Sequence, residues 1–146
     1  MPINSFFRST FALCLLILSG ALSADDSARA DQRISLGFSD AEKAAFLSEM
    51  RQMLVSVQGV IAGIGAEDRS AIVQAARYSG NRMARDTPLS IKQKTPLAFK
   101  EIGAPTHMMF EELVVRAETD DMSELASLTG ELMKQCVACH ALFTVQ

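Results

Sequence analysis

Apolar residues recur at three- and four-residue steps through most of this chain, and this spacing limits its fold more than any other feature. The pattern is clearest in a run headed by Ser39-Asp-Ala-Glu42, where a capping box stands directly before the first apolar position. The spacing predicts a long helix that starts at Ser39 and is ended by Gly63 and Gly65. Its apolar members are Phe46, Met50, Met53, Leu54, Val57, Val60, Ile61 and Ile64.

Two further runs with helical spacing follow. One covers residues 68–86 and should end before Pro88, because proline cannot continue a helix. The other begins after Pro96, and Pro105 is expected to kink or split it near Gly103. Between these two runs, the sequence from Leu89 to Lys94 is predicted to be a polar connector.

The last run begins near Asp121 and continues almost to the end of the chain. Alternating apolar and polar residues, which would indicate strands, are absent from the sequence. Four helical runs joined by short connections are typical of an antiparallel four-helix bundle. We therefore predict an all-α fold of this type.

The first 23 residues have the layout of a secretory signal peptide. Arg8 precedes an apolar core over residues 11–18, and small residues allow cleavage after Ser23 or Ala24. This core is too short to cross a bilayer as a stable helix. We therefore expect cleavage rather than an uncleaved anchor, export to the periplasm, and no stable membrane insertion after cleavage.

Beyond this signal, the chain has the length of one domain. Residues 24–38 are predicted to be a flexible polar leader, and residues 39–146 the four-helix domain. Loss of Arg8 leaves 13 basic against 17 acidic side chains, which changes the formal net charge from -3 to -4. No basic stripe remains to displace counterions from phosphates, and this argues against a nucleic-acid partner.

The residues with distinctive chemistry gather at the end of the last run. Since Cys14 lies in the signal peptide, the mature chain has two cysteines, Cys136 and Cys139, and both belong to a Cys-Val-Ala-Cys-His motif that ends at His140. In such a motif the two thiols can add across the two vinyl groups of a haem, while the imidazole reaches the iron. We therefore predict one covalently bound haem c on Cys136 and Cys139, with His140 as the proximal iron ligand, which makes residues 39–146 a haem-binding domain.

Two other interpretations of the motif compete with haem attachment. A redox dithiol needs a thiol of lowered pKa, which a helix N-terminus favours, but this motif lies near the end of a predicted helix, where the dipole acts in the opposite sense. A zinc site needs a fourth ligand, and His107 is the only other histidine. The haem interpretation is the strongest of the three.

An exported chain with four helical runs and Cys-Val-Ala-Cys-His on the last one resembles the class II c-type cytochromes, which comprise the cytochrome c-prime group and its low-spin, methionine-ligated relatives. The layout agrees over the whole mature chain, whereas class I cytochromes carry the motif near the N-terminus. One departure is that no basic residue follows the motif, although many class II members have an aromatic and then a basic residue there. The resemblance also implies a homodimer, a state that is common among the class II cytochromes.

The sixth iron ligand separates an electron carrier from a gas binder, because an occupied position resists diatomic ligands. In the predicted bundle, the end of the fourth helix lies beside the first halves of the first and third helices, so Met50, Met53 and His107 are pocket candidates. The low-spin relatives use a methionine on this helix, and the resemblance implies Met50 as the candidate distal ligand. Core packing by both methionines, ligation by His107, and a vacant position stay open, and Arg82 or Arg85 could pair with the haem propionates.

Two functions of different classes follow from this motif. The first is a periplasmic monohaem cytochrome that carries single electrons between periplasmic or membrane-bound redox proteins, with an acidic surface for docking. The alternative is a five-coordinate haem module that binds NO or CO. We do not expect an enzyme, since His107 is the only distal acid–base group that the sequence offers.

Overall fold

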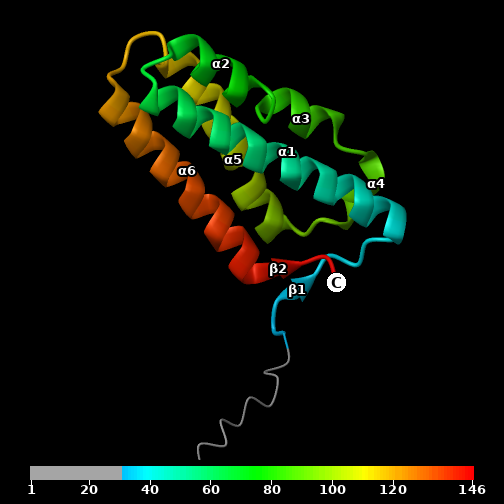
Figure 1. The fold of residues 1–146 in the computed structure, drawn as a ribbon. Coiled ribbons are helices and arrows are strands. Elements are labelled where there is room, and N and C mark those ends of the chain that lie inside the picture. The colour runs from blue at the N-terminus through cyan, green and yellow to red at the C-terminus, as the bar shows by residue number, and fades with distance from the viewer. Residues whose placement is uncertain (1–30) are drawn as a thin grey trace, which may run out of the picture. The chain divides into compact units, whose positions relative to one another are not determined.

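The computed structural model describes residues 31–146, and this part of the chain is mostly helical, which confirms the expected all-α class (Figure 1). The predicted signal peptide and its cleavage sites lie outside the described residues. A minimal parallel sheet joins the two ends of the described chain. The elements in chain order are β1 (Ile34–Ser35), α1 (Asp40–Gly65), α2 (Arg69–Arg77), α3 (Asn81–Asp86), α4 (Leu89–Lys94), α5 (Leu97–Arg116), α6 (Met122–Leu142) and β2 (Phe143–Thr144).

Capping boxes define the start of the two longest helices. Ser39 precedes α1, and its hydroxyl accepts from the Glu42 backbone N–H while the Glu42 carboxylate accepts from the Ser39 N–H. Asp121 and Glu124 make the same reciprocal pair at the start of α6. Each cap satisfies backbone donors that a helix N-terminus leaves unbonded. Both predicted helix starts are therefore confirmed.

The turn between α1 and α2 brings these two helices into close contact. α1 ends at Gly65, as predicted, and the Asp68 side chain caps α2 by accepting from the Ala71 N–H at 3.0 Å. A Cβ on Gly63 would lie 2.7 Å from Ile72 Cγ1. Glycine at this position thus allows α2 to pack directly on the last turns of α1.

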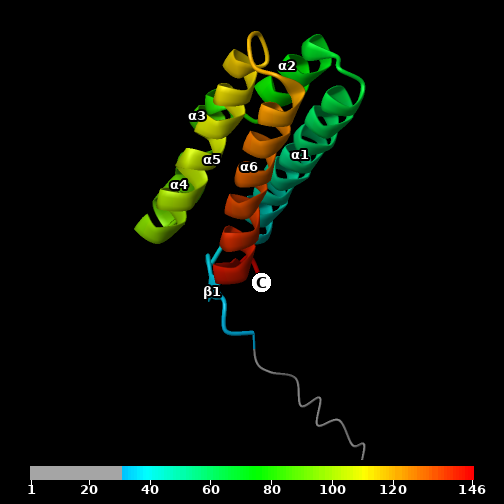
Figure 2. The same cartoon turned by 90° about the vertical axis from the view of Figure 1, so that its left-hand side faces the viewer.

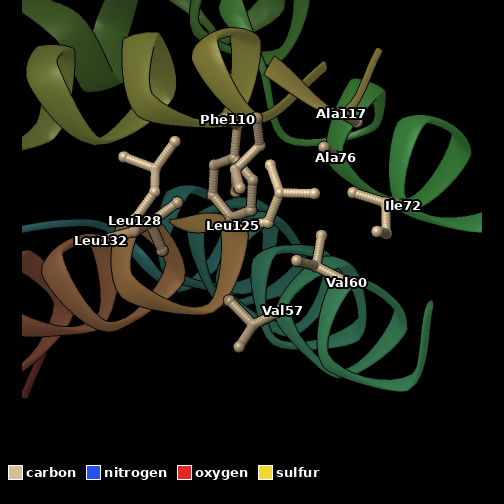
Figure 3. Packing of buried hydrophobic residues seen from close by; sticks show 10 residues of the cluster. Val57, Val60, Ile72, Ala76, Phe110, Ala117, Leu125, Leu128 and Leu132 are labelled. Atoms are coloured by element: carbon tan, nitrogen blue, oxygen red, sulfur yellow. The ribbon is translucent and has the colours of Figure 1, made fainter. Parts of the chain in front are cut away.

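One hydrophobic core joins α1, α2, α5 and α6. α6 lies between α1 and α5 and packs against both, and α2 packs against α1 and α5 (Figure 2). The core side chains converge from all four helices, with Phe110 of α5 near its centre (Figure 3). Burial of these side chains supplies the main driving force for folding. The buried members are Val57, Val60, Ile72, Ala76, Phe110, Leu113, Ala117, Leu125, Leu128 and Leu132.

The predicted second helix is broken, which corrects the sequence analysis. α2 ends at Arg77, and α3 begins only after Gly80. The buried Ser79 donates a hydrogen bond from its hydroxyl to Ser56 Oγ at 2.8 Å, and a Cβ on Gly80 would lie 2.3 Å from Glu111 Oε1. Contacts from α1 and α5 therefore hold this turn and interrupt the helix.

The stretch predicted as a polar connector is also helical. α4 occupies it, follows Pro88 and buries Ile91. The Pro88 carbonyl accepts from the Ile91 and Lys92 N–H groups at the start of α4, and Ile91 supplies an apolar anchor, so this polar segment forms a short helix.

α5 runs through Pro105 as one helix, so a split near Gly103 is wrong, while the other expectation, a kink at this point, stays a prediction. Proline lacks the N–H that would bond to the carbonyl four residues earlier. The neighbouring Thr106 adds a side-chain bond, since its hydroxyl donates to the Ile102 carbonyl at 2.8 Å. The hydroxyl of the buried Thr106 thus finds its partner within α5 itself.

The end of the predicted flexible leader is paired with the C-terminus. β1 runs parallel to β2 in the register Ile34 to Phe143 and Ser35 to Thr144 (Figure 1). Leu36, which follows β1, is buried. The leader prediction is therefore corrected for its last residues, because their backbone finds hydrogen-bond partners beyond α6 and Leu36 finds an apolar site.

No helix in residues 31–146 is long and apolar enough to cross a membrane.

Candidate functional site

A cavity of about 1160 Å³ opens between α1, α5, α6 and the α3–α4 segment. Its volume lies slightly above the usual range of small-molecule sites, which extends to about 1,000 Å³. Its wall is predominantly apolar. The candidates for haem attachment and iron ligation named from the sequence all line this one cavity: Met50 and Met53 from α1, His107 from α5, and Cys136, Cys139 and His140 from α6.

The motif presents its three functional side chains to the cavity because it lies on a regular helix. Cys136 and Cys139 are three residues apart, and Cys136 and His140 are four apart, so the three share one face of α6. Both cysteines are half-buried, whereas His140 is exposed. The imidazole is therefore free to meet a ligand that enters the cavity.

The two thiols are not activated for redox exchange. Cys136 and Cys139 are not joined in a disulfide. Burial raises the pKa of both thiols, and the proximity of Cys136 raises the pKa of Cys139 further. Reactive dithiols need the opposite shift, since the thiolate is the nucleophile. The local environment therefore disfavours the dithiol interpretation.

Within residues 31–146, no three His, Cys, Asp or Glu side chains are grouped so that they could hold a metal ion. A haem iron does not need such a group, because the protein contributes only its axial ligands.

Met50 and Met53 occupy different levels of the molecule. Met53 packs against the main core together with Cys136. Met50 packs with Cys139 against a second cluster of buried residues at the other end of the helices, formed by Leu36, Phe46, Ile91 and Phe143. Met50 and His140 also share a smaller neighbouring cavity of about 220 Å³. Of the two methionines, Met50 is therefore at the level of His140.

His107 is bound to the backbone through one ring nitrogen. Its Nδ1 lies 2.7 Å from the carbonyl oxygen of Ser79. Because a carbonyl oxygen only accepts, Nδ1 must carry the hydrogen, and Nε2 of the neutral ring is left with its lone pair. His107 thus helps to hold the turn between α2 and α3 while its ring forms part of the cavity wall.

Charged side chains interrupt the apolar wall. Three of them are the cations Arg51, Lys92 and Lys100, and the fourth is Glu49. Burial raises the pKa of Glu49, although a hydrogen bond from Thr87 Oγ1 at 3.3 Å and the charge of Lys92 act against this shift. The charged side chains of the cavity wall are therefore mainly cations.

The sequence analysis missed these cations and named two others. Arg82 and Arg85 do not line the cavity, whereas Arg51, Lys92 and Lys100 do. Arg51 directly follows Met50 in the sequence, and this adjacency is the one signal that could have identified it. Selecting Lys92 requires the position of α4, which the sequence analysis interpreted as a connector, and selecting Lys100 requires the rotation of α5.

Comparisons of the chain with protein-family models, with curated proteins and with solved structures find no match. The function is therefore inferred from the motif and the cavity.

Proposed function

We propose that this chain is an exported monohaem c-type cytochrome of the class II type that carries single electrons. Cys136 and Cys139 bind the haem through thioethers, and His140 is its proximal iron ligand. The observation that carries the proposal is that Cys136, Cys139, His140 and a methionine-bearing face of α1 line one large apolar cavity. The bound haem supplies an iron that alternates between the ferric and ferrous states.

The character of the cavity wall supports a haem as the occupant. Leu54 and Val137 line the cavity and are 67% and 66% exposed. A flat apolar macrocycle would remove such side chains from water, which is favourable. The three cations, Arg51, Lys92 and Lys100, suit the two propionates that a haem carries. A mainly apolar cavity with a few cations is therefore complementary to an amphipathic dicarboxylate.

The thiols need no oxidant for attachment. Each S–H would add across one vinyl group, so that a C–S bond would form and the hydrogen would go to the neighbouring carbon. The raised thiol pKa values are compatible with this role, because the product is a thioether without charge. The positions of Cys136 and Cys139 on successive turns of α6 set the spacing of the two bonds.

An antiparallel four-helix bundle is the arrangement that we propose for α1, the α2–α4 segment, α5 and α6. Short connections between successive helices and the packing of α1 on α2, α2 on α5 and α5 on α6 support it. In such bundles, cofactor sites are built from side chains on facing helices.

Met50 is the distal ligand that we propose, because it shares two cavities with His140 and lies at the level of Cys139. A thioether ligand favours ferrous iron and raises the potential. One observation favours the alternative function, a five-coordinate site for NO or CO: Met50 packs against the second cluster. If its sulfur stays there, the distal position is open.

The proposed partners of the exported protein are periplasmic or membrane-bound redox proteins. We also propose that the protein associates as a homodimer.

Production of the full chain in a bacterial host that matures c-type cytochromes tests the proposal. We expect the purified protein to retain haem in a denaturing gel, to show a sharp reduced α-band, and not to respond to carbon monoxide. The Cys136→Ala/Cys139→Ala variant should lose the covalent haem, whereas Lys134→Ala, next to the motif but outside the cavity wall, should retain it. A wild-type chain without covalent haem would refute the proposal, and a carbon monoxide shift would favour the gas-binding alternative.

A further inference from the structure

The last turn of α6 is supported by a segment from the other end of the described chain. A helix C-terminus leaves its last carbonyl oxygens without partners within the helix. Here the Phe143 N–H bonds to the carbonyl of Cys139, and Arg33 Nη1 donates to the carbonyl of His140 at 3.3 Å. The Arg33 cation also lies where a helix dipole favours positive charge. Arg33 thus holds the backbone of His140, the residue that carries the imidazole.

Backbone and side-chain bonds extend this support beyond α6. The Leu36 N–H donates to the Thr144 carbonyl at 2.9 Å, within the register of β1 and β2. The Ser35 hydroxyl donates to the Gln146 carbonyl at 2.7 Å. Residues 33–36 therefore bind the chain on both sides of the point where α6 ends, and we refer to them as the proximal strap.

Apolar contacts hold the proximal strap in place. Leu36 and Phe143 are each 5% exposed and belong to the second cluster. The rings of Phe143 and Phe99 meet edge to face with centroids 5.4 Å apart, a favourable geometry for aromatic pairs. Arg33 and Leu36 also line the smaller cavity, together with His140. The strap thus forms part of a packed wall on one side of the motif.

We propose that the proximal strap positions His140, with Arg33 as its main positioning residue. This inference rests on the proposed function. Arg33 does not bind the iron: it holds the backbone of His140, and the strap limits the movement of the helical turn that carries the imidazole. The positive charge of Arg33 adds a second, electrostatic effect, because a cation near the haem disfavours the more positive ferric state and so raises the potential. The predicted cleavage sites lie before the strap, so the mature chain keeps it.

Four variants of the full chain separate these effects. Arg33→Ala removes both charge and donor, Arg33→Lys keeps the charge, and Ser35→Ala loosens the strap without changing the charge. Arg77→Gln removes an exposed cation at the end of α2, outside both cavities, and is the matched charge control. The readouts are the reduction potential of the haem-loaded protein and the hydrogen-exchange rate of the Leu36 amide.

We expect Arg33→Ala to lower the reduction potential and to increase exchange at Leu36 several-fold. Arg33→Lys should restore most of the potential, Ser35→Ala should speed exchange with a smaller change in potential, and Arg77→Gln should change neither. An unchanged potential in Arg33→Ala would overturn the inference even if exchange became faster, because the strap would then be only structural. If the wild-type chain carries no covalent haem, the proposed function fails, while Leu36 exchange in the haem-free chain still reports whether Arg33 closes the strap.

Discussion

Ser56→Ala and Ser79→Ala should each lower the free energy of unfolding. The double variant should lose less than the two single losses added together. The two residues are 1% and 0% exposed, and the Ser79 hydroxyl donates to Ser56 Oγ at 2.8 Å. Each single change leaves the remaining hydroxyl buried without its partner, which costs about 1 to 3 kcal/mol. The double change removes both polar groups, so its cost should be smaller than the sum of the single costs, with a coupling energy of about 1 kcal/mol or more.

Urea unfolding of the two single variants and the double variant, followed by circular dichroism, measures this coupling. With a urea dependence of about 2 kcal/mol per molar, a loss of about 2 kcal/mol lowers the unfolding midpoint by roughly 1 M. Ser127→Ala is a suitable control, because Ser127 is exposed on α6 and bonds only to the Ser123 carbonyl within its own helix. Strictly additive free energies would show that the buried bond does not hold the turn between α2 and α3.

Three further predictions concern the site, a helix start and a pH dependence. Met50→Ala should convert the low-spin optical spectrum of the haem to a high-spin one that responds to carbon monoxide, and it should lower the reduction potential. Met53→Ala should leave the spectrum low-spin. The reverse pattern in the optical spectra would identify Met53 as the ligand. Ser39→Ala should lower the free energy of unfolding by about 1 kcal/mol in urea titrations through loss of the cap of α1, and a cost near zero would mean that this cap does not stabilise the helix. The hydrogen bond from Lys94 and, to a smaller extent, that from the Ser39 backbone N–H lower the pKa of Glu42 from 4.5 to about 2. The stabilisation that Glu42 provides is therefore complete above pH 4.5 and is lost as the pH falls towards 2. Lys94→Met should flatten the pH dependence of the free energy of unfolding between these two pH values, and an unchanged slope would contradict the assignment.

Local signals in the sequence predict the ends of several helices, because a cap or a terminating glycine acts within one turn. Ser39 with Glu42 and Asp121 with Glu124 are such pairs, and both helix starts lie where the sequence analysis predicts them. The break at Ser79 could not be predicted in this way. Its causes are Ser56 and Glu111, which lie 23 residues before Ser79 and 31 after Gly80 and come close only in the folded chain.

The candidate site also has a part that the sequence predicts and a part that depends on the packing of the folded chain. The spacing of Cys136, Cys139 and His140 on one helix predicts that they share a face, and this face lines the cavity. The rotation of α1 is a consequence of packing, so the spacing alone could not show that Leu54, a member of the apolar run, remains 67% exposed. The position of Lys92 depends in turn on α4, a helix of six residues whose single buried residue is Ile91. Short helices held by one apolar anchor have weak sequence signals.

The pairing of β1 with β2 makes the described chain a nearly closed loop. Arg33 and His140 are 107 residues apart, and Ser35 and Gln146 are 111 apart. Closing a loop of this length costs conformational entropy before any contact offsets it, and non-local contacts of this kind slow folding. The last buried residue of the main core is Leu132, and Cys136 is the last residue that packs against it, so β2 is not part of this core. A premature stop or a C-terminal protease cut after α6 would therefore leave the core able to form while the end beside the motif stays open.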